Sequence, residues 1–230
     1  MKKLTDRTPD LLSRMAEERQ ADALGQVIAL LDSYDGFFHL HHFAKGDHVI
    51  IMINGAFGCG KTSTAQMLQP FVANSLIFDP EEIGAMIRKI IPEKVRHIHE
   101  QTDDFQDIDL WKTLTVKVAG EVKKKYQKHL IVPMTLYKEE NFHYIYNGFK
   151  ELDEEIYHFC LLASEDTLYN RLAKRGDPAG GWSFQQTAKC AEAFRKDIFQ
   201  EHVITDHLKI SEIVNIILKR INNKDKCNSA

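Results

Sequence analysis

The sequence contains the segment Gly55-Ala56-Phe57-Gly58-Cys59-Gly60-Lys61-Thr62, followed by Ser63. This segment matches the pattern Gly-x-x-x-x-Gly-Lys-[Ser/Thr]. The backbone N–H groups of a curled, glycine-bearing loop can bind the oxygens of a polyphosphate without introducing a mobile charge. The N-terminus of a following helix adds more N–H donors and its positive dipole end. The pattern therefore predicts a phosphate-binding loop over Gly55–Ser63, in which Lys61 reaches the terminal phosphates and the Thr62 hydroxyl binds Mg²⁺.

The sequence on either side of this loop supports the prediction. Val49–Ile53 is a nearly continuous apolar run, as expected of a parallel strand buried on both faces. Lys61–Leu68 can form a helix, which ends before Pro70. A chance glycine turn before an ordinary helix is the alternative, and it leaves the preceding apolar run unexplained. We expect ATP and Mg²⁺ as ligands, with GTP as an alternative because no base-specifying motif of the G-protein type is visible.

Apolar runs alternate with amphipathic segments along the rest of the chain, which is typical of βαβ units. We predict a P-loop NTPase fold, an α/β architecture of three αβα layers around a five-stranded parallel sheet, over residues 48–222. Residues 1–47 are predicted as an N-terminal helical extension and 223–230 as a polar tail. The later predicted elements are strands at 75–78, 130–132, 157–162 and 203–205, and helices that include 182–199 and 210–221.

Composition excludes several classes of protein. The 230 residues are 43% hydrophobic and 27% charged with a formal net charge of -3, so no overall attraction to nucleic acid is expected. Lys123–Lys125 is predicted to be a solvated helix face. The four cysteines show no metal-binding spacing, which favours reduced thiols and a cytoplasmic location. No signal peptide or spanning segment is expected, and the final helix is expected to pack on the sheet rather than on a membrane.

Five segments in order resemble the bacterial tunicamycin resistance protein family, a branch of the P-loop kinase-like proteins. The resemblance extends from about His48 to Ile221 and implies a fold of the nucleotide-kinase type, ATP binding and a role in tolerance to a nucleoside-type antibiotic. The segments that carry it are Ile53–Gly58, Phe78–Glu81, Asp103–Gln106, Ile131–Thr135 and Glu201–Asp206.

Asp79 follows the second predicted strand, at the sheet edge where parallel α/β proteins bind ligands. In the kinase-like group a carboxylate here orients or deprotonates the acceptor hydroxyl, or holds Mg²⁺ through water. Asp79 is also a good helix N-cap, with Pro80 next and Glu82 placed for a capping box. The two roles can coexist.

Two further groups of residues are candidates through the resemblance. Arg88, Asp104, Phe105 and Trp111 are expected to line the acceptor pocket, although Arg88 can equally be solvated and the two rings can be core anchors. Arg171 and Arg175 precede the flexible Gly176–Gly181 segment and are expected to form a short lid, in which Arg171 packs on adenine and Arg175 reaches phosphate. Two exposed arginines one helical turn apart are the alternative.

The third predicted strand ends in Val132-Pro133-Met134-Thr135 and lacks the acidic residue of a usual Walker B strand. Mg²⁺ must then rely on Thr62, phosphate oxygens, water and Asp79. We hypothesise an ATP-dependent phosphotransferase in which Lys61, Asp79 and Arg175 are catalytic and the acceptor is a nucleoside-like or antibiotic hydroxyl. The alternative is an ATP-dependent protein that sequesters a drug without phosphoryl transfer.

Overall fold

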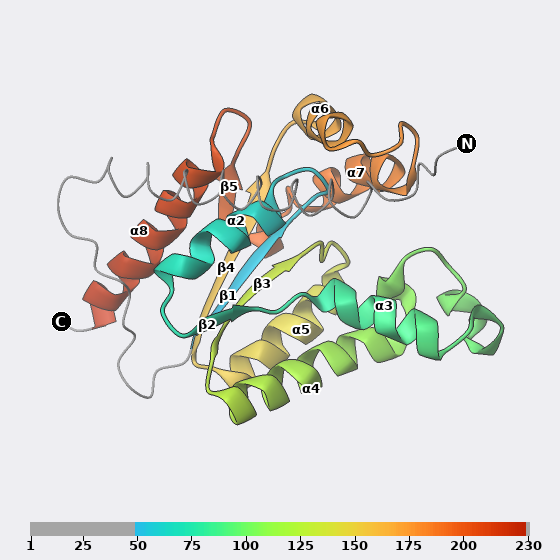
Figure 1. Ribbon diagram of the computed structural model, residues 1–230, viewed down its shortest axis with the longest axis horizontal. Coiled ribbons are helices and arrows are strands. Elements are labelled where there is room, and N and C mark those ends of the chain that lie inside the picture. The colour runs from blue at the N-terminus through green and yellow to red at the C-terminus, as the bar shows by residue number, and fades with distance from the viewer. Residues whose placement is uncertain (1–48, 229–230) are drawn as a thin grey trace, which may run out of the picture. The chain divides into compact units, whose positions relative to one another are not determined.

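A computed structural model describes residues 49–228, which form a parallel sheet covered by helices (Figure 1). The predicted extension at 1–47 lies outside the described residues. All five strands are parallel and lie in the order β2-β3-β1-β4-β5, which confirms the predicted fold class. The strands are β1 (Val49–Gly55), β2 (Ser75–Ile77), β3 (His129–Met134), β4 (Glu155–Leu162) and β5 (His202–Ile204).

The central position of β1 follows from its sequence. All seven of its residues are buried, since β3 and β4 pair with its two edges and helices cover its faces. Ile51 pairs with Ile131 on one side and with Tyr157 on the other. The strand therefore delivers the glycine-rich loop to the middle of the carboxyl edge of the sheet, where α/β proteins bind ligands.

Helices lie on both sides of the sheet. Figure 1 shows α2 (Lys61–Leu68) and α8 (Ile210–Asn228) on one side, with α4 (Asp109–Tyr126) and α5 (Glu139–Leu152) on the other. The final helix, which was predicted to pack on the sheet, contacts α2, and its Ile213, Val214, Ile217 and Ile221 are buried. The other helices are α3 (Pro80–Ile90), α6 (Glu165–Arg175) and α7 (Trp182–Ala193).

The structure corrects several predicted boundaries. Helix α5 was not predicted, although Phe142, Ile145 and Phe149 form its buried stripe. Helix α7 ends at Ala193 rather than at 199, and a short 3₁₀ turn at Asp197–Phe199 follows it. Helix α8 continues to Asn228, through most of the segment predicted as a polar tail. These differences concern the ends of elements and one amphipathic helix. They do not affect the five predicted strands.

Lys123 is buried, contrary to the prediction of a solvated face. Its Nζ lies 2.7 Å from Asp153 Oδ2, and both side chains are 7% exposed. Burial lowers the pKa of Lys123, and the bond to Asp153 opposes that shift. None of the described helices combines the length and apolar character required to cross a membrane.

Candidate active site

The phosphate loop has the backbone that its glycines predict. Gly55, Gly58 and Gly60 have φ values of 144°, 82° and 97°, which L side chains rarely adopt. A Cβ on Gly55 would lie 2.5 Å from the Leu161 carbonyl oxygen and 2.7 Å from Cys59 Sγ. The loop therefore requires glycine at position 55 for both conformation and space.

Lys61 lies over this loop at the start of α2. Its Nζ donates a hydrogen bond of 3.0 Å to the Ala56 carbonyl oxygen and lies 5.5 Å from the centroid of the Phe57 ring. The residue is only 9% exposed, whereas Thr62 and Ser63 are exposed at the first turn of the helix. The ammonium group is thus held close to the backbone that would surround a phosphate.

A cavity of about 600 Å³, which we call the loop cavity, opens beside the loop. Ligand sites commonly have volumes of about 300–1,000 Å³. Arg171 and Arg175 of α6 line this cavity together with the phosphate loop, although the two segments lie far apart in the sequence. Its lining residues are Phe57, Gly58, Gly60, Lys61, Thr62, Ser63, Glu81, Arg171, Arg175, Trp182, Ser183, Leu208, Lys209 and Ile210.

Asn54 fixes the start of the loop, and the sequence analysis did not single it out. Its Oδ1 accepts hydrogen bonds of 2.9 Å from the backbone N–H groups of Gly55 and Leu136. Its Nδ2 donates to the Leu136 carbonyl oxygen at 3.1 Å. One buried side chain therefore ties the end of β1 to the segment that follows β3. In the sequence, the position of Asn54 at the end of the apolar run Val49–Ile53 was the only indication of this role.

Arg171 is held at the loop cavity by the segment after β5. Its guanidinium donates to the Thr205 carbonyl oxygen at 2.6 Å and to Thr205 Oγ1 at 3.2 Å. The adjacent Asp206 carboxylate accepts from the Ser164 hydroxyl at 2.6 Å and from Thr167 Oγ1 at 2.8 Å. These bonds to Ser164 and Thr167 lower the pKa of Asp206 to about 2. Thr205 and Asp206, at the end of the Glu201–Asp206 segment that carries part of the resemblance, thus attach α6 to the chain after β5.

Arg175 ends α6 and forms an ion pair with Asp177. Its Nε lies 3.0 Å from Asp177 Oδ1, and a second, closer contact joins Nη2 to Oδ2. The hydrogen bond to Asp177 raises the pKa of Arg175, which therefore stays positively charged. Gly176, at φ 89°, ends the helix immediately afterwards.

Asp79 and Glu81 stand at the start of α3, and of these two carboxylates only that of Glu81 lines the loop cavity. Asp79 Oδ1 caps the helix by accepting from the Glu81 N–H at 2.9 Å, so the cap bond goes to Glu81 rather than to Glu82. Glu81 lines the cavity and was not selected from the sequence. Burial raises the pKa of both groups. For Glu81, the positive charges of Lys61 and Arg175 oppose that shift.

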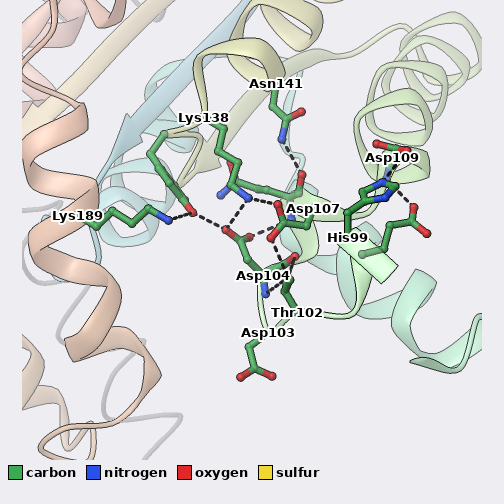
Figure 2. Close-up of polar contacts among 12 residues, drawn as sticks. His99, Thr102, Asp103, Asp104, Asp107, Asp109, Lys138, Asn141 and Lys189 are labelled. Atoms are coloured by element: carbon green, nitrogen blue, oxygen red, sulfur yellow. Dashed lines mark hydrogen bonds and ion pairs between the residues drawn. The ribbon is translucent and has the colours of Figure 1, made fainter. Parts of the chain in front are cut away.

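Asp104 belongs to a buried polar cluster next to α7 (Figure 2). The Tyr137 hydroxyl donates to Asp104 Oδ2 at 2.6 Å, and Lys189 Nζ donates to the same hydroxyl at 3.2 Å. The Gln106 N–H bonds Asp104 Oδ1 at 2.9 Å, and Lys138 Nζ lies 3.5 Å from Oδ2. Burial and the Asp104 carboxylate raise the pKa of Tyr137. Asp104 therefore holds neighbouring loops together.

The other three predicted acceptor residues contact one another around α3. Arg88 donates to the Asp103 carbonyl oxygen and lies 5.9 Å from the Phe105 ring centroid. Phe105 packs on Trp111 with ring centroids 5.0 Å apart. Trp111 is only 1% exposed, and its Nε1 donates to the Pro80 carbonyl oxygen at 2.9 Å. Trp111 is thus a core anchor that holds the first turn of α3.

We expect Trp111→Phe to destabilise the protein, since it leaves the buried Pro80 carbonyl without this donor. Loss of one partner of a buried hydrogen bond costs about 1–3 kcal/mol. Urea denaturation followed by circular dichroism measures the free energy of unfolding. Tyr144→Phe is the control, because its bond to Thr113 is exposed and 3.5 Å long. An equal loss of stability in both variants would contradict the anchoring role.

The strand order and the conformation of the glycine-rich loop define a P-loop protein with a fold of the nucleotide-kinase type. The chain belongs to the family described as AAA domain, whose model matches residues 51–198. Among curated protein sequences, none matches the chain.

Solved structures extend this comparison. The Deinococcus radiodurans tunicamycin resistance protein is 27% identical over 76% of this chain and 95% of its own, with a TM-score of 0.62, which confirms the predicted resemblance. A gluconokinase from Sinorhizobium meliloti is 17% identical over 80% of this chain and 98% of its own, at 0.54. A shikimate kinase from Acinetobacter baumannii is 12% identical over 78% and 95%, at 0.53. The two kinases share the fold.

Proposed function

We propose that this protein is an ATP-dependent phosphotransferase that moves the γ-phosphoryl group to a hydroxyl of a small-molecule acceptor. The observation that carries the proposal is the loop cavity, in which Lys61, Arg171 and Arg175 meet beside the phosphate loop. These three of the four cations that line the cavity suit a triphosphate and the charge that develops during its transfer.

Each residue has a distinct role in this proposal. The backbone of the loop and Lys61 bind the phosphates, Arg171 packs on the base, and Arg175 stabilises the transferring group. Asp79 orients the acceptor hydroxyl, because its carboxylate lies one residue before α3 at the sheet edge. Catalysis is then mostly positioning and electrostatics.

The donors present also fit Mg²⁺. The exposed hydroxyl of Thr62 and the carboxylate of Glu81 line the same cavity, and Mg²⁺ prefers oxygen ligands together with phosphate and water. Bound Mg²⁺ supplies neutralising charge between phosphate oxygens. The free, buried thiols of Cys59, Cys160 and Cys190 support a cytoplasmic location, where ATP and Mg²⁺ are available.

We propose a nucleoside-like or antibiotic acceptor. The support is the similarity to a protein named for tunicamycin resistance, at 27% identity. The Arg88 and Phe105 side chains are partly exposed and lie together, so they are available to contact an acceptor, while Asp104 and Trp111 hold the loops around them.

One observation favours the alternative function, an ATP-dependent protein that sequesters a drug. β3 ends at Met134, and the buried Thr135 follows where a Walker B acid would stand. Incubation with γ-labelled ATP, Mg²⁺ and tunicamycin, uridine or gluconate separates the two functions. Label on any of these acceptors supports the phosphotransferase. Tight binding of tunicamycin in the presence of ATP, without label, supports the sequestering protein.

Asp79→Asn tests the proposed role of this carboxylate. Asparagine caps helices about as well as aspartate, so the fold and ATP binding should persist. We expect turnover to fall by about 100-fold, which is a typical contribution of general acid–base catalysis. Steady-state kinetics with the acceptor found by labelling, beside calorimetry for ATP, measures both. Unchanged turnover would remove Asp79 from the proposed mechanism.

A further inference from the structure

Among the described residues that line the loop cavity, Glu81 is the single acidic one. The remaining lining residues are neutral or basic, and they include Lys61, Arg171, Arg175 and Lys209. A carboxylate placed among phosphate-binding cations repels a triphosphate unless a cation lies between them. Its presence there calls for a specific explanation.

The backbone of Glu81 is held from two sides. The Asp79 carboxylate accepts its N–H at 2.9 Å, and Trp111 Nε1 donates to the preceding carbonyl, that of Pro80, at 2.9 Å. Pro80 itself begins α3 with its fixed φ. These anchors fix the first turn of the helix. The backbone of Glu81 is therefore held in place, with its side chain in the lining of the cavity.

The surroundings of the Glu81 carboxylate identify what it faces. Burial raises its pKa, and so do the nearby carboxylates of Asp79 and Glu82, whereas the positive charges of Lys61 and Arg175 lower it. Both cations are the groups that we assign to the terminal phosphates. By contrast Glu82, the next residue on the helix, is exposed and lies outside the cavity lining.

A hydrated divalent cation resolves the repulsion between Glu81 and a triphosphate. Mg²⁺ keeps several of its water molecules in proteins and is bound through one or two carboxylates together with substrate phosphates. β3 supplies no acid for this purpose, since it reads His-Leu-Ile-Val-Pro-Met. We propose that Glu81 holds the hydrated Mg²⁺ of Mg·ATP, and so replaces the missing strand carboxylate opposite Thr62. The inference rests on the ATP-binding part of the proposed function and does not require phosphoryl transfer.

Calorimetric titration of ATP, in Mg²⁺ and in EDTA, tests this assignment. For the unmodified protein we expect Mg²⁺ to strengthen ATP binding. In Glu81→Gln we expect at least about a tenfold smaller strengthening, because a neutral amide attracts hydrated Mg²⁺ less than a carboxylate does. Metal-free ATP should bind Glu81→Gln at least as tightly as the unmodified protein, since the repulsive charge is gone. A purely structural defect would instead weaken ATP binding equally with and without the metal.

Glu82→Gln is the matched control, because it makes the same change one residue further along α3 on an exposed side chain. It should retain the full Mg²⁺ effect. Glu81→Asp keeps the charge on a shorter side chain and should restore part of the effect, which guards against a folding defect. An undiminished Mg²⁺ effect in Glu81→Gln, or its loss in Asp79→Asn alone, overturns the assignment. If no acceptor is labelled but Glu81→Gln loses the Mg²⁺ effect, the phosphotransferase proposal fails and the role of Glu81 stands.

Discussion

Lys61→Ala should weaken Mg·ATP binding by about 100-fold, because it removes the cation that the fold holds over the phosphate loop. A hydrogen bond to a charged group contributes about 1.5–3 kcal/mol, and each 1.4 kcal/mol is a tenfold change in affinity. Lys61 Nζ already lies 3.0 Å from the Ala56 carbonyl oxygen, within the curl of the loop. Isothermal calorimetry with Mg·ATP measures the change directly.

The chain offers a control for Lys61 within the same cavity. Lys209 also lines the loop cavity, but it is exposed and follows β5 rather than the phosphate loop. Lys209→Ala should change ATP affinity by less than about threefold, as expected of an exposed charge that solvent screens. If Lys61→Ala keeps the unmodified affinity, or loses no more than Lys209→Ala, the segment Gly55–Ser63 is not the phosphate site.

The sequence predicted the elements of the fold that depend on local pattern. Val49–Ile53 could be assigned because a strand buried on both faces is apolar throughout. The pattern of Gly55–Thr62, directly after a strand and before a helix, has few interpretations other than a phosphate-binding loop. The order of the strands could not be derived, because it depends on pairings such as that of Ile51 with Ile131 and Tyr157. Helix α5 was not predicted, although Phe142, Ile145 and Phe149 recur at the spacing of one helix face.

The candidate site was predicted less completely, for a physical reason. The Gly55–Ser63 loop is a local structure, whereas the loop cavity is assembled from segments that meet only in the folded chain. Glu81 was overlooked because Asp79 explained the helix start, and the sequence does not show which carboxylate faces a cavity. Trp111 was expected to contact an acceptor, yet its Nε1 bond to Pro80 places it in the core.

Arg175→Ala should lower the rate of phosphoryl transfer by about 1,000-fold, the lower end of the effect of an arginine that stabilises the transferring group. Arg175 lines the loop cavity at the end of α6, and Glu81 lies within its electrostatic reach. Because this charge acts mainly when negative charge develops on the γ-phosphoryl group, the affinity for ATP should fall by less than about tenfold. Single-turnover kinetics with labelled ATP and the acceptor found by labelling separates these two quantities.

Two further variants separate the role of Arg175 from that of its neighbours. Arg171→Ala should weaken ATP binding more than it slows transfer, since we assign Arg171 to the base and its guanidinium is tied to the Thr205 carbonyl oxygen. Asp177→Asn leaves Arg175 in place and removes its ion-pair partner, and because Arg175 itself is exposed, transfer should change by less than about threefold. If Arg175→Ala lowers ATP affinity but leaves the transfer rate at saturating ATP unchanged, Arg175 binds only the ground state, and the stabilisation of the transferring group must come from other groups of the site.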